Sequence, residues 1–301
     1  MSQLEALLDA AASAARDERA SPAERAQMLM ELAMGVQRRP RNAAQLGSAI
    51  ALYDEALGLC PREEALLRAR IRARRATALQ ALPEGDAGIE EARATYEEVI
   101  PTLAREGTPA EVAEAEMNLG LCLQHLAGAG RARISEAIAA YQRALRTFDA
   151  RGYPVEFALL QSNLATAFLS MPGRDEKARL REALAVQCFE EALQAIDAAE
   201  HPAEYAMLQN NLGNALQCVS SGQALRNRER AIAAYDAALE VRTADARPVE
   251  HASTLANKAN CLWSLGEAEA ARALYARALE IFESHGEAEK ARAVREALEE
   301  G

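Results

Sequence analysis

One short frame with an aromatic residue at its centre returns six times along this chain of 301 residues. The frame reads Ala/Val-x-x-x-Tyr/Phe-x-x-Ala/Val-Leu/Ile, and its aromatic residues are Tyr53, Tyr96, Tyr141, Phe189, Tyr235 and Tyr275. The steps between them are 43, 45, 48, 46 and 40 residues. Such a period is typical of a solenoid, because each repeat can bury its apolar face only against its neighbours. The pattern therefore predicts a stack of repeats, read as a single domain over residues 1–301.

A second helical pattern precedes each aromatic frame. Its equivalent positions, each at the start of a stretch of small and apolar residues, are Glu31, Arg74, Asn118, Asn163, Asn211 and Asn257. Apolar residues one turn apart place one face of a helix against a partner helix. Each repeat is therefore predicted to be a helical hairpin, with helix A followed by helix B.

Proline and glutamate mark the starts of most A helices. The motif Pro-x-Glu begins at Pro22, Pro109, Pro154, Pro202 and Pro248. Proline loses no hydrogen bond at the first position of a helix, and glutamate suits the positive end of the helix dipole. Ser21 and Thr108 precede two of these prolines and complete capping boxes.

The two ends of the chain are predicted to be capping helices. Ser2 and Glu5 form a capping box that opens an N-terminal helix within residues 1–20, and a last helix rich in Glu and Arg covers residues 286–300. The six repeats occupy residues 22–283 between them. An open stack needs terminal helices with a polar outer face, so neither end requires a functional explanation.

Composition and charge limit the kinds of partner. Hydrophobic residues make up 50% of the chain but aromatic residues only 4%, and the abundance of alanine is typical of packed helices. The formal net charge of −11 argues against a nucleic-acid or membrane binder, because both need clustered cations. It fits a protein or peptide partner that is neutral or basic overall, although net charge also serves solubility. The excess of arginine over lysine suggests a bacterial source.

Cysteine usage and the N-terminus point to the cytoplasm. The five cysteines have no CxxC spacing and an odd total, which is typical of reduced, mostly buried thiols. Glu5 and Asp9 stand where a signal peptide would need a basic flank and an apolar run, and no segment approaches 18 consecutive apolar residues. We expect a cytoplasmic protein without a membrane span.

These repeats resemble the tetratricopeptide repeat family, whose 34-residue hairpin carries small residues in helix A and an Ala, Tyr/Phe, Ala series in helix B. The last repeat matches the family's spacing, with 18 residues from Asn257 to Tyr275 and Leu265-Gly266 as its turn. The run from Pro202 to Leu216 is similar to a longer bacterial variety, found in arrays linked to CHAT proteases or signalling NTPases. The resemblance implies an all-α superhelix of six hairpins.

The resemblance also implies a binding groove, because helix A lines the concave side in this family. The residues expected to face it as carboxamides are Asn118, Asn163, Asn211, Asn214, Asn257 and Asn260. A carboxamide donates to a peptide carbonyl and accepts from a peptide N–H, so a row of them could hold an extended main chain. The alternative is that asparagine is simply frequent at this position in the family.

Three larger side chains on the same face could supply selectivity. Arg70 and Arg74 lie one turn apart and could clamp a carboxylate, resembling in part the carboxylate clamps of chaperone-binding relatives. The alternative is a solvated or interhelical salt-bridge role. Trp263, the only tryptophan, could anchor a partner or pack against the C-terminal helix.

Signals for catalysis are weak. Cys122 and His125 lie one turn apart but lack a third or fourth ligand nearby in sequence. We find no phosphate loop, GxSxG or HExxH motif. We therefore expect a non-catalytic adaptor without cofactor or metal. Two alternatives stay open, a self-associating scaffold, that is a homo-oligomer, and a regulatory subunit of a separately encoded protease or NTPase.

Overall fold

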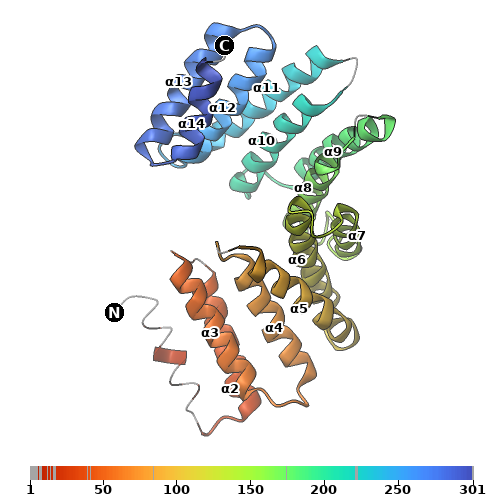
Figure 1. Cartoon of the computed structure of the whole chain (residues 1–301). Helices are drawn as coiled ribbons and strands as arrows, with labels where there is room; N and C mark the ends of the chain where they lie inside the picture. The colour runs from red at the N-terminus through yellow and green to blue at the C-terminus, as the bar shows by residue number, and fades with distance from the viewer. Residues whose placement is uncertain are drawn as a thin grey trace. The chain divides into compact units, whose positions relative to one another are not determined.

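The computed structural model describes residues 6, 9–11, 13, 15, 18–38, 40, 42–83, 85–173, 175–220 and 223–299. The expected capping box of Ser2 and Glu5 lies outside these residues. The described part of the chain is helical and contains no β-strand (Figure 1).

Helices A and B alternate in chain order, as the repeats predict. The A helices are α2 (Pro22–Gln37), α4 (Ala65–Gln80), α6 (Pro109–Gly128), α8 (Pro154–Ser170), α10 (Pro202–Cys218) and α12 (Pro248–Ser264). The B helices are α3 (Ala43–Leu59), α5 (Gly85–Glu106), α7 (Ile134–Ala144), α9 (Glu176–Ala195), α11 (Ala224–Val241) and α13 (Ala268–Ser284). A last helix, α14 (Ala288–Glu299), follows. Each A helix packs against the B helix that follows it, so the prediction of six hairpins is confirmed over the described residues.

The predicted helix starts are confirmed. Pro22, Pro109, Pro154, Pro202 and Pro248 are the first residues of their helices. Ser21 and Thr108 each accept a hydrogen bond from the backbone N–H of the glutamate three residues on, and that glutamate's carboxylate accepts from the backbone N–H of the cap. These capping boxes satisfy N–H groups that have no partner within the helix.

The chain divides into two compact units, residues 1–148 and 149–301. In unit 1, A helix α4 touches both α2 and α6. In unit 2, A helix α10 touches both α8 and α12. Each unit therefore presents a face built from three neighbouring A helices, which we call its A-helix face.

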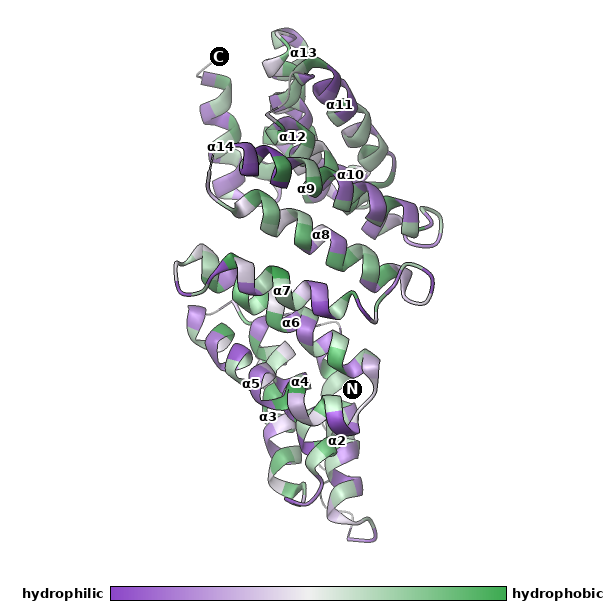
Figure 2. Cartoon of the chain, turned by 90° about the vertical axis from the view of Figure 1, so that its right-hand side faces the viewer, coloured by the Kyte–Doolittle hydropathy of each residue, from purple (hydrophilic) through white to green (hydrophobic). Residues whose placement is uncertain are grey.

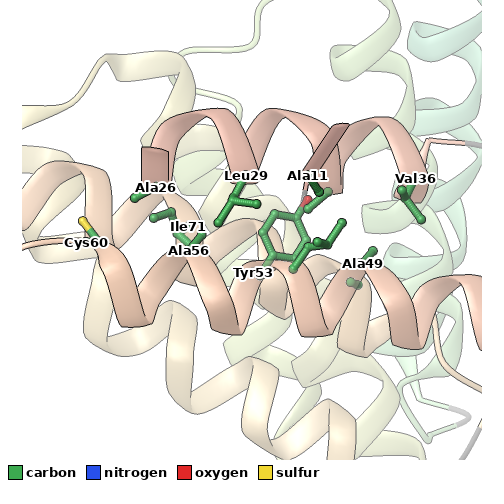
Figure 3. Close-up of a cluster of buried hydrophobic side chains, with 12 residues drawn as sticks. Ala11, Ala26, Leu29, Val36, Ala49, Tyr53, Ala56, Cys60 and Ile71 are labelled. Carbon is green, nitrogen blue, oxygen red and sulfur yellow. The ribbon is translucent and has the colours of Figure 1, made fainter. Parts of the chain in front are cut away.

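The core of each repeat lies between its two helices. The frame aromatics are buried to 3% exposure or less, as predicted. In the first repeat, the ring of Tyr53 reaches from α3 toward Leu29 of α2, and Ala11 of the N-terminal segment joins the same cluster (Figure 3). At the other end, Ala291 and Val294 of α14 pack into the cluster of the last repeat. Both ends of the chain thus cover apolar side chains of the repeat beside them.

Hydrophobic and hydrophilic residues mix along single helices, for example along α8 and α11 (Figure 2). This is expected of helices with one buried face. None of the described helices is both long enough and apolar enough to span a membrane.

Candidate functional site

The A-helix face of unit 2 carries the row of asparagines that the sequence predicts. Asn163, Asn211 and Asn257 come from α8, α10 and α12, and each is partly buried with some surface open to solvent. No hydrogen bond joins the Asn163 side chain to another described residue. A carboxamide offers two N–H donors and an acceptor oxygen, so this group keeps its whole hydrogen-bonding capacity.

A fourth asparagine, Asn210, joins two members of this row. The Asn257 Nδ2 donates to Asn210 Oδ1 at 3.1 Å, and the Asn210 Nδ2 donates to Asn211 Oδ1 at 3.2 Å. Asn210 is only 8% exposed, so it holds its neighbours rather than facing a ligand. The bridge leaves the Asn211 Nδ2 and the Asn257 Oδ1 without a described partner. Asn210 was not among the predicted site residues, and its only signal in the sequence was its place next to Asn211.

The frame tyrosines occupy the side-chain oxygens of Asn214 and Asn260. The Tyr235 hydroxyl donates to Asn214 Oδ1 at 2.7 Å, and the Tyr275 hydroxyl donates to Asn260 Oδ1. Burial raises the pKa of both tyrosines, so the hydroxyls stay protonated donors. Each asparagine keeps an Nδ2 donor that no described residue binds.

Trp263 lies on the same helix as Asn257 and Asn260. Its ring is partly buried and packs against the apolar cluster that includes Ala291 and Val294 of α14. The guanidinium of Arg272 lies over the ring, 5.7 Å from its centroid. Both contacts hold the indole in place and leave part of it accessible.

Unit 1 presents charged side chains instead of a row of asparagines. The Arg70 Nε donates to Glu111 Oε1 at 2.5 Å and its Nη2 donates to Glu111 Oε2 at 3.2 Å. The Arg74 Nη2 donates to Glu114 Oε2 at 3.0 Å, and its Nη1 bonds the other oxygen. The interhelical salt-bridge interpretation is therefore confirmed for both arginines. A ligand carboxylate could reach them only by displacing a carboxylate of α6.

Glu111 is also the glutamate of the Thr108 capping box. Its Oε2 accepts from the Thr108 backbone N–H at 2.8 Å while the same carboxylate binds Arg70. Hydrogen bonding from Arg70 first, and then from Thr108, lowers the pKa of Glu111 to about 2. One carboxylate thus fixes the start of α6 and its contact with α4.

One small cavity is lined by Asn118 together with Arg70 and Arg74. This cavity of about 30 Å³ lies among α4, α5 and α6, and Glu111 and Glu114 also line it. Its volume is large enough to hold a water molecule. Asn118 is 8% exposed, so little of its carboxamide can reach a ligand.

Two larger hollows lie along α2 in unit 1, where sequence analysis named no site residue. One of about 650 Å³ is lined by Gln27, Met28 and Glu31, among others. The other, of about 640 Å³, is lined by Glu31, Met34 and Arg74, among others. Met28 and Met34 are 42% and 36% exposed, so both present apolar surface at these hollows. The missed signal was their position three residues to either side of Glu31.

The cysteine and histidine pair does not form a reactive site. Cys122 is fully buried, its Sγ accepts from the Gln80 Nε2 at 2.6 Å, and burial raises the pKa of its thiol to about 12. The His125 Nε2 lies 3.0 Å from Asp86 Oδ1 on the exposed surface. The thiol is therefore protonated at neutral pH, and the imidazole is turned to another partner. The described residues contain no cluster of three or more metal-ligating side chains.

Comparison with known families places one match in the last hairpin. Residues 252–285, which span α12 and α13, match the tetratricopeptide repeat model. No curated protein sequence matches the chain.

Solved structures of similar fold cover most of the chain at low sequence identity. BtubC (BKLC) from P. vanneervenii is 18% identical with a TM-score of 0.55, and the alignment covers 95% of this chain and 93% of that one. A Rap protein complexed with Competence and Sporulation Factor is 15% identical with a TM-score of 0.54, covering 91% of this chain and 76% of that one. A signal transduction ATPase with a tetratricopeptide repeat sensor from Pyrococcus horikoshii is 16% identical with a TM-score of 0.54, and the alignment covers 87% of this chain and 42% of that one.

Proposed function

Because the chain is a tetratricopeptide repeat protein, we propose that it is a non-catalytic adaptor that binds a segment of another protein on its A-helix faces. Repeats of this family usually mediate protein–protein interactions and are usually non-catalytic. The partner we propose is neutral or basic overall, since the chain carries a net charge of −11.

The observation that carries this proposal is the set of unused amide groups on the A-helix face of unit 2. Asn163 has both its donor and acceptor groups open, Asn211 and Asn214 offer Nδ2 donors, and Asn257 offers its Oδ1 acceptor. An extended main chain presents alternating N–H and C=O groups, which these carboxamides can pair. The bridge through Asn210 and the bond from Tyr235 hold three of these groups in one orientation before a ligand arrives. Such preorganisation lowers the entropy cost of binding.

The amide row alone gives only modest affinity. A hydrogen bond contributes about 1 kcal/mol net, so four of them support weak binding unless side-chain contacts add to it. In unit 2 Trp263 is a candidate for such a contact, because tryptophan is enriched among residues that dominate interfaces. In unit 1 Met28 and Met34, beside hollows of about 650 and 640 Å³, could receive apolar side chains. Arg70 and Arg74 would add selectivity only for a ligand able to compete with Glu111 and Glu114.

The Rap protein of similar fold was solved with a bound factor, Competence and Sporulation Factor. That complex makes a binding role for this fold reasonable, and the identity of the ligand does not transfer at 15% sequence identity.

The test begins with capture of partners from native lysate by the full chain, followed by mass spectrometry. The affinity of the identified partner is then measured for Asn163→Ala/Asn211→Ala, which removes two carboxamides from the row. We expect a loss of about tenfold or more, because two hydrogen bonds of about 1 kcal/mol each are removed.

A matched control is Gln142→Ala/Gln194→Ala, which removes two exposed carboxamides from B helices α7 and α9. It should bind as the parent does. If the asparagine variant stays folded by circular dichroism and binds with unchanged affinity, the proposed mechanism is rejected.

A further inference from the structure

A separate pocket of about 280 Å³ lies within unit 2, between α8, the start of α10 and the junction of α11 with α12. Its apolar walls include Leu159, Met207 and Val241, with Ala203 and Ala206 beside them. Leu159 and Met207 lie one helical turn before the asparagines of their helices, so the pocket is next to the amide row and distinct from it. Four charged side chains complete its lining, and these decide what it can bind. They are Glu204, Arg242, Arg247 and Glu250.

Arg242 is a partly buried guanidinium with most of its donors unused. Its Nη1 donates to Thr254 Oγ1 at 3.0 Å, and no other hydrogen bond or ion pair involves its side chain among the described residues. Thr254 is fully buried and in turn donates to the Glu250 backbone oxygen at 2.9 Å, so the guanidinium is held in place. Burial lowers the pKa of Arg242 and Arg247 adds to that effect, while the nearby Glu250 carboxylate opposes it. A partly buried guanidinium that no described carboxylate pairs with directly would gain from a bound anion.

The other three charges leave one carboxylate open. The Arg247 Nη1 pairs with Glu250 Oε1 at 3.5 Å, so these two charges balance each other. Glu204, in the first turn of α10, has no ion pair or side-chain hydrogen bond with a described residue. Among the described residues, Arg242 and Glu204 are therefore a cation and an anion without a salt-bridge partner, beside an apolar wall.

We propose that this pocket binds a free α-amino acid with an aliphatic side chain. Arg242 binds its carboxylate, with a planar fork of N–H groups suited to two carboxylate oxygens. Glu204 binds its ammonium group, and the side chain lies against Leu159, Met207 and Val241. This site is independent of the proposed adaptor function.

The volume of the pocket supports a ligand of this size. About 280 Å³ is room enough for one amino acid. Both charges of a zwitterion find a partner, so neither the ligand nor the protein is left with an unpaired charge in a partly dry site.

The test is calorimetric titration of the full chain with L-leucine, L-isoleucine and L-methionine, and with three analogues. N-acetyl-L-leucine lacks the ammonium group and imitates the last residue of a peptide. L-leucinamide lacks the carboxylate and imitates a first residue. Glycine keeps both charges and lacks the side chain. We expect the aliphatic amino acids to bind, and each analogue to bind at least about tenfold more weakly, since each loses one of the three contacts.

Two substitutions test the assigned partners. Glu204→Gln should lower the affinity for leucine at least about tenfold. It should lower the affinity for N-acetyl-leucine less, because the charge that is removed faces the ammonium group. Arg242→Lys keeps the positive charge and loses the planar fork of N–H groups. It should therefore lower the affinity for leucine without unfolding the chain. Glu200→Gln and Arg226→Gln are matched controls on exposed residues outside the pocket and should bind as the parent does. The Asn163→Ala/Asn211→Ala variant should also keep leucine binding, which separates this site from the adaptor function.

Three results would overturn the proposal. One is no heat of binding for any of the amino acids up to 10 mM. Another is N-acetyl-leucine or leucinamide binding as tightly as leucine, which would assign the pocket to a peptide end. The third is unchanged leucine affinity in a folded Glu204→Gln protein.

Discussion

A tyrosine hydroxyl buried inside a helical hairpin needs a hydrogen-bond partner, and side-chain amides of helix A provide it in the described hairpins. The hydroxyls of Tyr53, Tyr96, Tyr141 and Tyr235 bond the side-chain oxygens of Gln37, Gln80, Gln124 and Asn214, and Tyr275 bonds Asn260. The fourth hairpin is the exception: it has Phe189, which has no hydroxyl, and Leu169 at the position where four of the other repeats have glutamine. The two positions change together because an unpaired buried polar group is costly.

This pairing predicts that an amide and its hydroxyl can be removed together at little cost. Gln124→Leu should destabilise the protein by about 1–3 kcal/mol, because the Tyr141 hydroxyl loses its acceptor. Adding Tyr141→Phe should recover most of that loss and copy the natural pair of Phe189 and Leu169. Urea denaturation of both variants measures this, and a double variant no more stable than the single one would contradict it.

Two glycines on A helices allow frame tyrosines to pack closely. A Cβ placed on Gly120 would lie 2.4 Å from Cε1 of Tyr141, and one on Gly213 would lie 2.6 Å from the ring of Tyr235. Gly120→Ala should therefore destabilise by about 1–3 kcal/mol, although alanine favours a helix more than glycine does. Gly47→Ala is the matched control, because its Cβ meets nothing within 4 Å and should stabilise by up to about 1 kcal/mol. Equal effects of the two substitutions in urea denaturation would show that the tyrosine contact is unimportant.

At the scale of helices, Glu111 couples the start of α6 to α4. Its pKa is lowered to about 2 in the folded chain, so the folded state holds this carboxylate's proton more weakly than the unfolded state. The stabilisation is therefore complete above the ordinary value of about 4.5 and is lost as the pH falls toward 2. We predict that the Glu111→Gln variant is less stable at neutral pH and loses less stability than the parent between pH 6 and pH 3.

The measurement is the urea midpoint as a function of pH for both proteins. Glu24→Gln is the matched control, since Glu24 completes the capping box of α2 and has no described arginine partner. Its pH dependence should stay closer to that of the parent. Parallel curves for the parent and Glu111→Gln would rule out the assigned coupling.

Which helices form could be predicted where the sequence contains local signals. Prolines and capping boxes marked five A helices, but α4 begins at Ala65 after Glu64, whose side chain does not cap it. Pro101 would ordinarily end a helix, yet α5 continues to Glu106, because Leu103 in the extra turn is buried at 2% exposure.

The amide row was predictable because its members are equivalent in the repeats. The pairing of Arg70 with Glu111 was not, because the two are 41 residues apart and only the packing of α4 on α6 joins them.

At the scale of the whole chain, each unit has an apolar cluster of its own. In unit 1 the first repeat buries Tyr53 and Leu29, and in unit 2 the last repeat buries Tyr275 and Phe282. In a repeat array, stability is approximately the sum of single repeats and of contacts between neighbours. A change in one repeat should therefore be felt in adjacent repeats and fade with distance along the chain.

We predict that Tyr275→Ala, which empties the core of the last hairpin, weakens that hairpin by about 3–5 kcal/mol. Hydrogen exchange followed by mass spectrometry should show faster exchange in α12, α13 and α14, a smaller effect in α10 and α11, and none in α2–α5. The variant Tyr53→Ala should give the reverse pattern, with the effect centred on α2 and α3. Local loosening of one hairpin cannot reach distant repeats. If either substitution accelerates exchange equally in all described helices, the chain unfolds as one cooperative block and the prediction is contradicted.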